Sequence, residues 1–266
     1  MSDNSNMPFL KHIEVLRWHF IRSIIAVFIC SIIAFLGKNF IFDTIVFGPK
    51  DPNFLTYRVL CSISKIIGID DAMCIDEIPF IIQNRTMTGQ FSSHIWVSLI
   101  SGFIIAFPYV IFELWSFLKP GFSKKEKKYS SYIILSSSFL FMAGVLFGYY
   151  LITPLSITFL ASYTISPQIS NEIDITSYIS TISTIVLASA IIFQLPVIVY
   201  FLTKIGLLSP SIMKKYNRHV IVVMLIISAV ITPPDVASQI LVCLPLMALY
   251  QFSILICKIV LKREKK

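Results

Sequence analysis

The chain has 266 residues, of which 56% are hydrophobic and only 14% carry a charge, with a formal net charge of +8. Soluble domains carry about 25% charged residues, so this composition excludes an ordinary soluble globular protein. A bilayer core about 30 Å thick needs about 20 helical residues at roughly 1.5 Å each. Asp, Glu, Lys and Arg are absent from the runs 23–37, 86–112, 129–171, 175–203, 219–234 and 236–257. We therefore predict an all-α integral membrane protein with six transmembrane helices, forming one membrane domain over residues 1–266.

The first predicted helix starts in a basic segment and continues through residues 23–37. No cleavage site with small residues follows Phe35, so we expect an uncleaved membrane helix rather than a removed signal peptide. An outer loop at about 38–90 comes next, and its prolines and short apolar runs predict short helices outside the membrane. Cys61 and Cys74 both lie in this loop. A disulfide between them and two free thiols both remain open on the sequence alone.

The loop after the second predicted helix, 119–131, packs five lysines around a single carboxylate, Glu126. Ser123 and Glu126 have the spacing of a capping box, which gives the acid a structural explanation at the start of the third helix. An electrostatic explanation competes with it, because a carboxylate near the membrane surface binds a guanidinium strongly and bidentately. Glu14 and Glu113 are predicted on the same face, and the lysines suit anionic lipid headgroups.

Three polar features mark the C-terminal half of the chain. Gln194 lies within the fourth predicted helix, where a polar residue either bonds a neighbouring helix or serves a function. Asp235 closes the outer turn that begins at Thr232, and it is expected to cap the sixth helix. Ser238 and Gln239 follow one turn later, at the outer end of that helix.

The basic residues set the orientation, because cytoplasmic loops carry an excess of Lys and Arg. The run 129–171 is too long for one span, and Thr153-Pro154 predicts an exit near its middle. With that exit, the segments on one side of the membrane hold 17 Lys and Arg against 5 Asp and Glu, and those on the other hold 5 against 9. We therefore predict both termini in the cytoplasm, and we interpret the basic balance as an orientation signal rather than as nucleic-acid binding.

Enzyme signatures are scarce. No H-E-x-x-H pattern, G-x-S-x-G motif or phosphate-binding glycine loop occurs, so we predict no catalytic residue, metal or cofactor. An intramembrane hydrolase lacks a nucleophile-and-base pair. Pro108, Pro196 and Pro245 fall inside predicted helices and indicate kinks. Together with Gln194 they leave a small-solute secondary transporter as an alternative function, although no inverted repeat is visible.

Several blocks together resemble one family, the twin-arginine protein translocase subunit TatC. The blocks are FLKHIEVLRWHF, VSLISGFIIAFPYVIFELWSFLKPGFSKKEKK, FQLPV and ITPPDVASQILVCLPL. The resemblance implies a cupped bundle of six helices in the cytoplasmic (inner) membrane. It also implies a non-enzymatic core receptor for the Arg-Arg signal peptides of folded proteins. Such a receptor works with TatA-like and TatB-like single-helix partners, other copies of itself and membrane lipids, and the proton motive force drives export.

The resemblance also implies roles for single residues. Glu126 matches the loop glutamate that contacts the twin arginines, and Phe117 and Pro120 match the aromatic residue and the proline beside it. Leu16 and Arg17 match the N-terminal block of the same site. The other matches are the outer-loop proline, the outer-turn aspartate and the polar patch where a partner helix docks: Pro49, Asp235, Thr232, Ser238 and Gln239.

Two positions depart from the family pattern. Val15 stands where the pattern has Glu, and Glu14 lies one residue earlier, about 100° around a helix. Gln194 stands where many members have a membrane-embedded Glu. Glutamine forms hydrogen bonds but does not titrate, so we expect no proton to be carried at this position.

Overall fold

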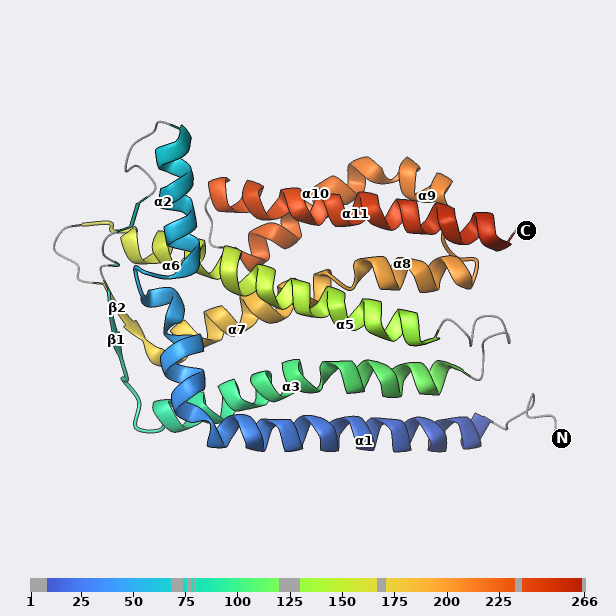
Figure 1. Ribbon diagram of the computed structural model, residues 1–266, viewed down its shortest axis with the longest axis horizontal. Helices are drawn as coiled ribbons and strands as arrows, with labels where there is room; N and C mark the ends of the chain where they lie inside the picture. Colours follow the sequence, from blue (N-terminus) through green and yellow to red (C-terminus); the bar gives the residue numbers. More distant parts are fainter. Residues whose placement is uncertain are drawn as a thin grey trace. The chain divides into compact units, whose positions relative to one another are not determined.

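The computed structural model describes residues 9–67, 74–75, 78, 80–119, 130–166, 171–232 and 236–264. These residues are mostly helical, and their elements can be followed in chain order in Figure 1. Within this part of the chain, five helical stretches are long and apolar enough to cross a membrane: Ile13–Leu36, Gly89–Leu118, Ser131–Ser162, Ile175–Lys204 and Val242–Lys262. The prediction of a helical multi-pass membrane protein is confirmed at this level.

The helix expected as the fifth of six spans is shorter than these five. It is α10 (Asn217–Ile231), with 15 residues. At a rise of 1.5 Å per residue it is about 22 Å long, which is less than the roughly 30 Å of a bilayer core. Six crossings therefore stay a prediction.

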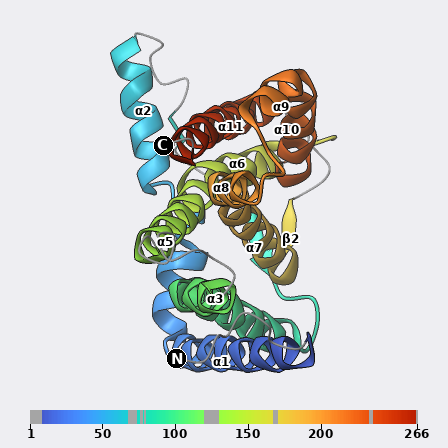
Figure 2. The same cartoon turned by 90° about the vertical axis from the view of Figure 1, so that its right-hand side faces the viewer.

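The chain divides into two compact units, and the first contains residues 1–38 and 94–139. Here α1 (Phe9–Leu36) lies alongside α3 (Gly89–Leu118), as Figures 1 and 2 both show. At one end of this helix pair, the His94 ring stacks on Phe35 with ring centroids 3.8 Å apart, and its Nε2 lies 3.0 Å from the Phe35 carbonyl oxygen. In the middle, a Cβ placed on Gly102 would lie 2.6 Å from the Cα of Ser31. Glycine is therefore what permits this close approach of the two backbones.

The second unit contains residues 39–93 and 140–266 and holds most of the helices. After residues 39–93, the chain returns to it along α5 (Ser130–Phe147), which continues without interruption through a π-helical segment, η4 (Gly148–Ile152), into α6 (Thr153–Ser162). The helix therefore does not end at Thr153-Pro154. Pro154 lies in the first turn of α6, where its missing N–H costs little.

A break divides the next predicted span into α7 (Ile175–Ile192) and α8 (Leu195–Lys204), with Phe193 and Gln194 between them. The break arises because Pro196 has no N–H to donate and lies in the first turn of the new helix. Pro108 and Pro245 are instead inside continuous helices, α3 and α11 (Val236–Glu264). A short helix, α9 (Pro210–Lys215), precedes α10.

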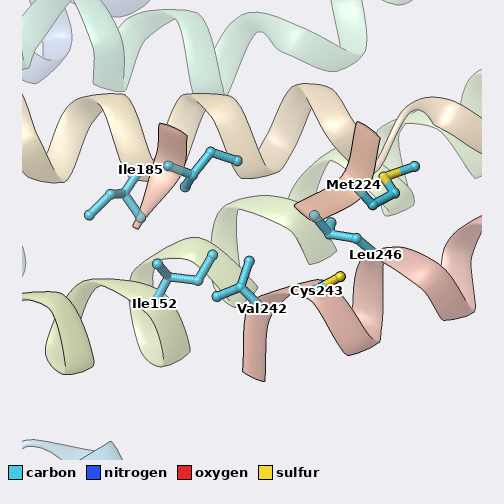
Figure 3. Close-up of a cluster of buried hydrophobic side chains, with 7 residues drawn as sticks. Ile152, Ile185, Met224, Val242, Cys243 and Leu246 are labelled. Carbon is cyan, nitrogen blue, oxygen red and sulfur yellow. The ribbon is translucent and has the colours of Figure 1, made fainter. Parts of the chain in front are cut away.

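The core of the second unit forms where α7, α10 and α11 meet the η4 segment (Figure 3). Most of its buried members come from α10 and α11, whereas η4 and α7 supply one each. The buried residues are Ile152, Ile185, Met224, Ile231, Val242, Cys243 and Leu246. A second cluster joins α8, α9 and α11 through Val199, Met213, Ile254 and Cys257.

The outer loop contains short helices, as the sequence predicts, but it also contributes a strand that pairs with a second strand between α6 and α7, and the all-α prediction missed both. Strands β1 (Ile81–Gln83) and β2 (Glu172–Asp174) pair in parallel, with Ile82 opposite Ile173. Three residues per strand are too few for a periodic pattern to appear in the sequence. The helical elements are η1 (Phe40–Val46), η2 (Gly48–Lys50) and α2 (Leu55–Ile67).

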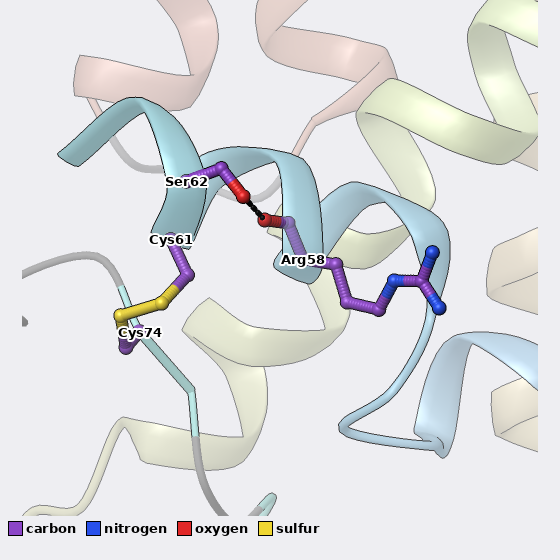
Figure 4. Close-up of a disulfide and its surroundings, with 4 residues drawn as sticks. All are labelled: Arg58, Cys61, Ser62 and Cys74. Atoms are coloured by element: carbon purple, nitrogen blue, oxygen red, sulfur yellow. Dashed lines mark hydrogen bonds between the residues drawn. A yellow bond between two sulfur atoms is a disulfide. The ribbon is translucent and has the colours of Figure 1, made fainter. Parts of the chain in front are cut away.

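A disulfide joins Cys61 of α2 to Cys74, with the two Cα atoms 4.4 Å apart (Figure 4). The two cysteines are 13 residues apart in the sequence. The bond ties the middle of α2 to the chain that leads back toward β1. Of the two alternatives left open by the sequence, the structure contains the bonded one.

Candidate functional site

The first predicted site residues lie in the N-terminal part of α1. Glu14, Leu16 and Arg17 are exposed, whereas Val15 is half-buried. Val15 therefore turns toward the protein side of the helix and Glu14 away from it, which follows from the rotation of about 100° between consecutive helical residues. Glu14 does not occupy the place of the missing Glu at position 15.

Glu113 of α3 is the buried centre of a polar cluster in the first unit. The residue is only 4% exposed, although it carries a carboxylate inside an apolar helix. The Tyr109 hydroxyl donates a hydrogen bond to Oε1 at 2.7 Å, and Nδ1 of His19 lies 2.5 Å from Oε2. Arg22 of α1 adds an electrostatic attraction. A buried carboxylate is costly unless it is paired, and here partners from both helices surround it.

Phe117 joins this cluster from the last turn of α3. Its ring meets the His19 ring edge-on, with centroids 6.3 Å apart and planes inclined by 63°. Tyr109, Glu113 and Phe117 are spaced four residues apart, so they lie along one face of α3. We call His19, Tyr109, Glu113 and Phe117 the Glu113 cluster.

The loop that the sequence singles out follows this cluster directly. The described part of α3 ends at Leu118, and Lys119 is exposed. Pro120 and Glu126 lie outside the described residues. The loop therefore begins at Lys119, directly after the helical turn that carries Phe117.

Pro49 is buried in the second unit. The hydroxyl of the buried Tyr57 donates to the Pro49 carbonyl at 2.8 Å, and burial raises the pKa of Tyr57 above its ordinary value. The neighbouring carbonyl of Val46 accepts from the Tyr178 hydroxyl at 3.0 Å. Pro49 therefore anchors the outer loop to α2 and α7, because tyrosines from both helices bond the carbonyls around it.

The polar residues near the α10–α11 connection hold these two helices together. Thr232 is buried and its hydroxyl donates to the Ser228 carbonyl at 2.8 Å. The Ser228 hydroxyl donates to the Gln239 carbonyl at 2.7 Å, and Nε2 of Gln239 donates to the Leu225 carbonyl at 3.1 Å. Asp235 lies outside the described residues, and for Ser238 only its place on α11 is described.

Gln194 is half-buried at the break between α7 and α8. The backbone carbonyl oxygen of Gln194 accepts hydrogen bonds from the backbone amides of Val197 and Ile198, each at 3.0 Å. These are the first hydrogen bonds of α8. The sequence predicted that Gln194 lies inside a continuous helix. The structure places it instead at an interruption of the span.

Sequence reasoning selected Glu113 and Phe117 but missed His19, Tyr109 and Ser228. The signal for Tyr109 is its spacing of four residues from Glu113. The signal for Ser228 is a lone hydroxyl within the apolar run of α10. His19 gives no such signal, because its partner is 94 residues away in the sequence.

Most of this chain matches one known protein family. The sequence profile of one family, "Sec-independent protein translocase protein (TatC)", matches residues 11–245. A protein of that name from Blattabacterium sp. subsp. Periplaneta americana is 43% identical over 264 residues, covering 99% of each chain. The protein of the same name from Aquifex aeolicus is 31% identical, with 98% of each chain covered.

Two solved structures share the fold. One, described as "Crystal Structure of Twin Arginine Translocase Receptor- TatC", matches with a TM-score of 0.67 and 29% identity, covering 94% of this chain and 99% of the other. A second, of the same receptor in DDM, has a TM-score of 0.69 and 30% identity, covering 92% and 98%. The likeness therefore extends over nearly the whole of each chain.

Proposed function

Because this chain belongs to the TatC family of Sec-independent protein translocase proteins, we propose that it is the receptor for Arg-Arg signal peptides in its translocase. Membership makes it a protein-transport subunit and the core component of a twin-arginine translocase. The observation that carries the receptor role is the match, over nearly the full chain, to a structure described as a twin-arginine translocase receptor. The comparisons do not support the small-solute transporter.

In the proposed arrangement the chain crosses the cytoplasmic (inner) membrane six times, with α10 as the short fifth crossing and both termini in the cytoplasm. The excess of Lys and Arg in the N-terminal segment, the 119–131 loop, 204–218 and the C-terminus supports this orientation. A disulfide in the outer loop is compatible with it, because disulfides persist outside the reducing cytosol.

The signal-peptide site is proposed to combine the Glu126 loop with the adjoining ends of α1 and α3. Glu126 supplies the carboxylate for a guanidinium, and Phe117 and Pro120 flank it. Leu16, Arg17 and Glu14 contribute the α1 side, where all three are exposed. A guanidinium matches a carboxylate bidentately, which explains why an Arg pair would be preferred over Lys.

Single-helix TatA-like and TatB-like proteins are proposed to dock near Thr232, Ser238 and Gln239. The Thr232 hydroxyl already bonds the Ser228 carbonyl at the end of α10, and the Gln239 side chain of α11 bonds the Leu225 carbonyl of α10. Their proposed role is therefore to set the geometry of these two helices, against which the partner helix packs. Pro49 and Asp235 would hold the outer loop and the outer turn in place.

A charge reversal tests the receptor proposal. Glu126→Lys in the full chain should weaken binding of an Arg-Arg signal peptide at least about 30-fold, because losing one partner of a bonded charge pair costs roughly 2–5 kcal/mol. Binding is measured with a labelled peptide in membranes, with Glu264→Lys as the matched control because it reverses a charge at the end of α11. Equal binding by the two variants would contradict the proposal.

A further inference from the structure

We infer that His19 and Glu113 are positioning residues of the signal-peptide receptor, which set the place of Phe117 relative to the exposed N-terminal part of α1. The inference rests on the proposed receptor function; it adds His19, which the sequence did not indicate, and gives Glu113 the role of holding the His19 ring. The His19 imidazole bonds the buried Glu113 carboxylate of α3, and it also meets the Phe117 ring at the end of the same helix.

The bond between His19 and Glu113 is well suited to fix one relative arrangement of the two helices. Glu113 is almost fully buried, so sliding α1 along α3 would leave its carboxylate without the imidazole partner. Such a separation is strongly unfavourable in an apolar environment, and polar pairs of this kind are best known for specifying register. The Tyr109 hydroxyl holds the other oxygen, which limits how far the carboxylate can turn.

The same bond controls both sides of the proposed peptide site. On α3, Phe117 is four residues after Glu113 and touches the ring that Glu113 holds. On α1, Leu16 and Arg17 are three and two residues before His19, in the adjoining turn, and both are exposed. The position of His19 on Glu113 therefore determines where these α1 residues lie relative to Phe117.

This role can be separated from general stability, because the α1–α3 pair has other contacts. His94 bonds and stacks on Phe35 at the opposite end, and Gly102 packs on Ser31 between the two ends. These contacts remain when the Glu113 cluster is altered, so the helix pair is expected to form while only the end beside the loop changes.

The test compares four versions of the full chain in membranes: the unchanged chain, His19→Asn, Glu113→Gln and His94→Ala. Asparagine retains an N–H near the place of Nδ1, and so keeps a bond to Glu113, but it has no ring to meet Phe117. His94→Ala is the matched control, because it also removes a histidine contact between α1 and α3. Affinity is measured for an Arg-Arg signal peptide, and the thermal unfolding midpoint is measured for each variant in detergent.

We expect His19→Asn and Glu113→Gln to weaken peptide binding about tenfold, since displacements near 1 Å in a preorganised site have effects of this order or larger. His19→Asn should leave the unfolding midpoint nearly unchanged, whereas His94→Ala should lower the midpoint and leave the affinity within about twofold. Unchanged affinity in His19→Asn and Glu113→Gln would overturn the inference. A loss of affinity in His94→Ala as large as theirs would also overturn it, since stability alone would then explain the effect.

The Glu126→Lys variant distinguishes this inference from the receptor proposal. If the unchanged chain binds the Arg-Arg peptide and Glu126→Lys does not, the receptor proposal stands, whatever the result at His19. If the unchanged chain shows no preference for Arg-Arg over Lys-Lys peptides, the receptor proposal fails, and with it the role assigned to His19 and Glu113.

Discussion

Gly102 and Glu113 show how single residues determine the packing of α1 on α3. Gly102 lies where the absent side chain lets the two backbones approach, and Glu113 lies where a buried charge requires a partner from the other helix. Sequence reasoning found Glu113, because an acid next to a long charge-free run is conspicuous. It did not find His19 or the role of Gly102, because pairing across helices depends on how the helices are turned toward each other.

A methyl group at Gly102 should destabilise the helix pair. In Gly102→Ala the new Cβ would lie 2.1 Å from Oγ of Ser31 and 2.5 Å from its backbone nitrogen, so α1 and α3 must move apart. Overpacking of this kind costs about 1–3 kcal/mol, and the thermal unfolding midpoint in detergent should fall. Gly37→Ala is the control, because its Cβ would meet only carbonyl oxygens at 3.6 Å. Equal midpoints for the two variants would show that the close approach at Ser31 does not constrain the packing.

At the scale of elements, the long apolar helices follow directly from the sequence, whereas the interruptions do not. The charge-free runs predicted the five long helical stretches, since hydrophobic length determines them. The parallel strands β1 and β2 were missed, because their pairing is between segments about 90 residues apart. The break at Gln194 had a visible cause in Pro196, but proline predicts a kink and a full break equally well.

Asp174 joins the strand pair to α7 and makes this junction sensitive to acid. Its Oδ1 caps α7 by accepting from the Thr176 amide at 2.8 Å, and its Oδ2 accepts from the Arg85 amide at 3.1 Å. The hydrogen bonds from Thr176, the hydroxyl bond first, hold the pKa of Asp174 below its ordinary value. Because the pKa of Asp174 is lower in the folded state, its hydrogen bonds stabilise the fold fully at a pH above the pKa of the unfolded state. This stabilisation is lost as the pH falls through the pKa of the folded state.

We therefore expect the amides of Arg85 and Thr176 to lose protection from hydrogen exchange as the pH falls below about 4, after correction for intrinsic exchange rates. In Asp174→Asn this acid dependence should disappear, because no carboxylate remains to protonate. Glu172→Gln serves as the control, since it changes an exposed acid of the same strand. Protection that stays constant down to pH 2 in the unchanged chain would contradict the role assigned to Asp174.

For the whole molecule, membership of the TatC family accounts for an apolar chain with several helices long enough to cross a membrane. Composition indicated the membrane class, and the loop and turn motifs indicated the family resemblance that the comparisons confirm, whereas the orientation inferred from the positive residues stays a prediction. The proposed peptide site could be predicted only as a set of residues. The contacts between α1 and α3 that we propose to arrange it, such as His19 with Glu113, do not follow from any sequence motif.

Site-specific crosslinking tests the receptor claim most directly. A photoreactive residue at position 117 lies at the end of α3, next to the Glu126 loop, so it should contact a peptide bound there. In membranes containing a folded cargo with an Arg-Arg signal peptide, we predict a crosslink between position 117 and the peptide that is lost when the pair becomes Lys-Lys. A crosslink of equal yield with both peptides, or none with either, would contradict the claim that this chain recognises twin-arginine signal peptides at this site.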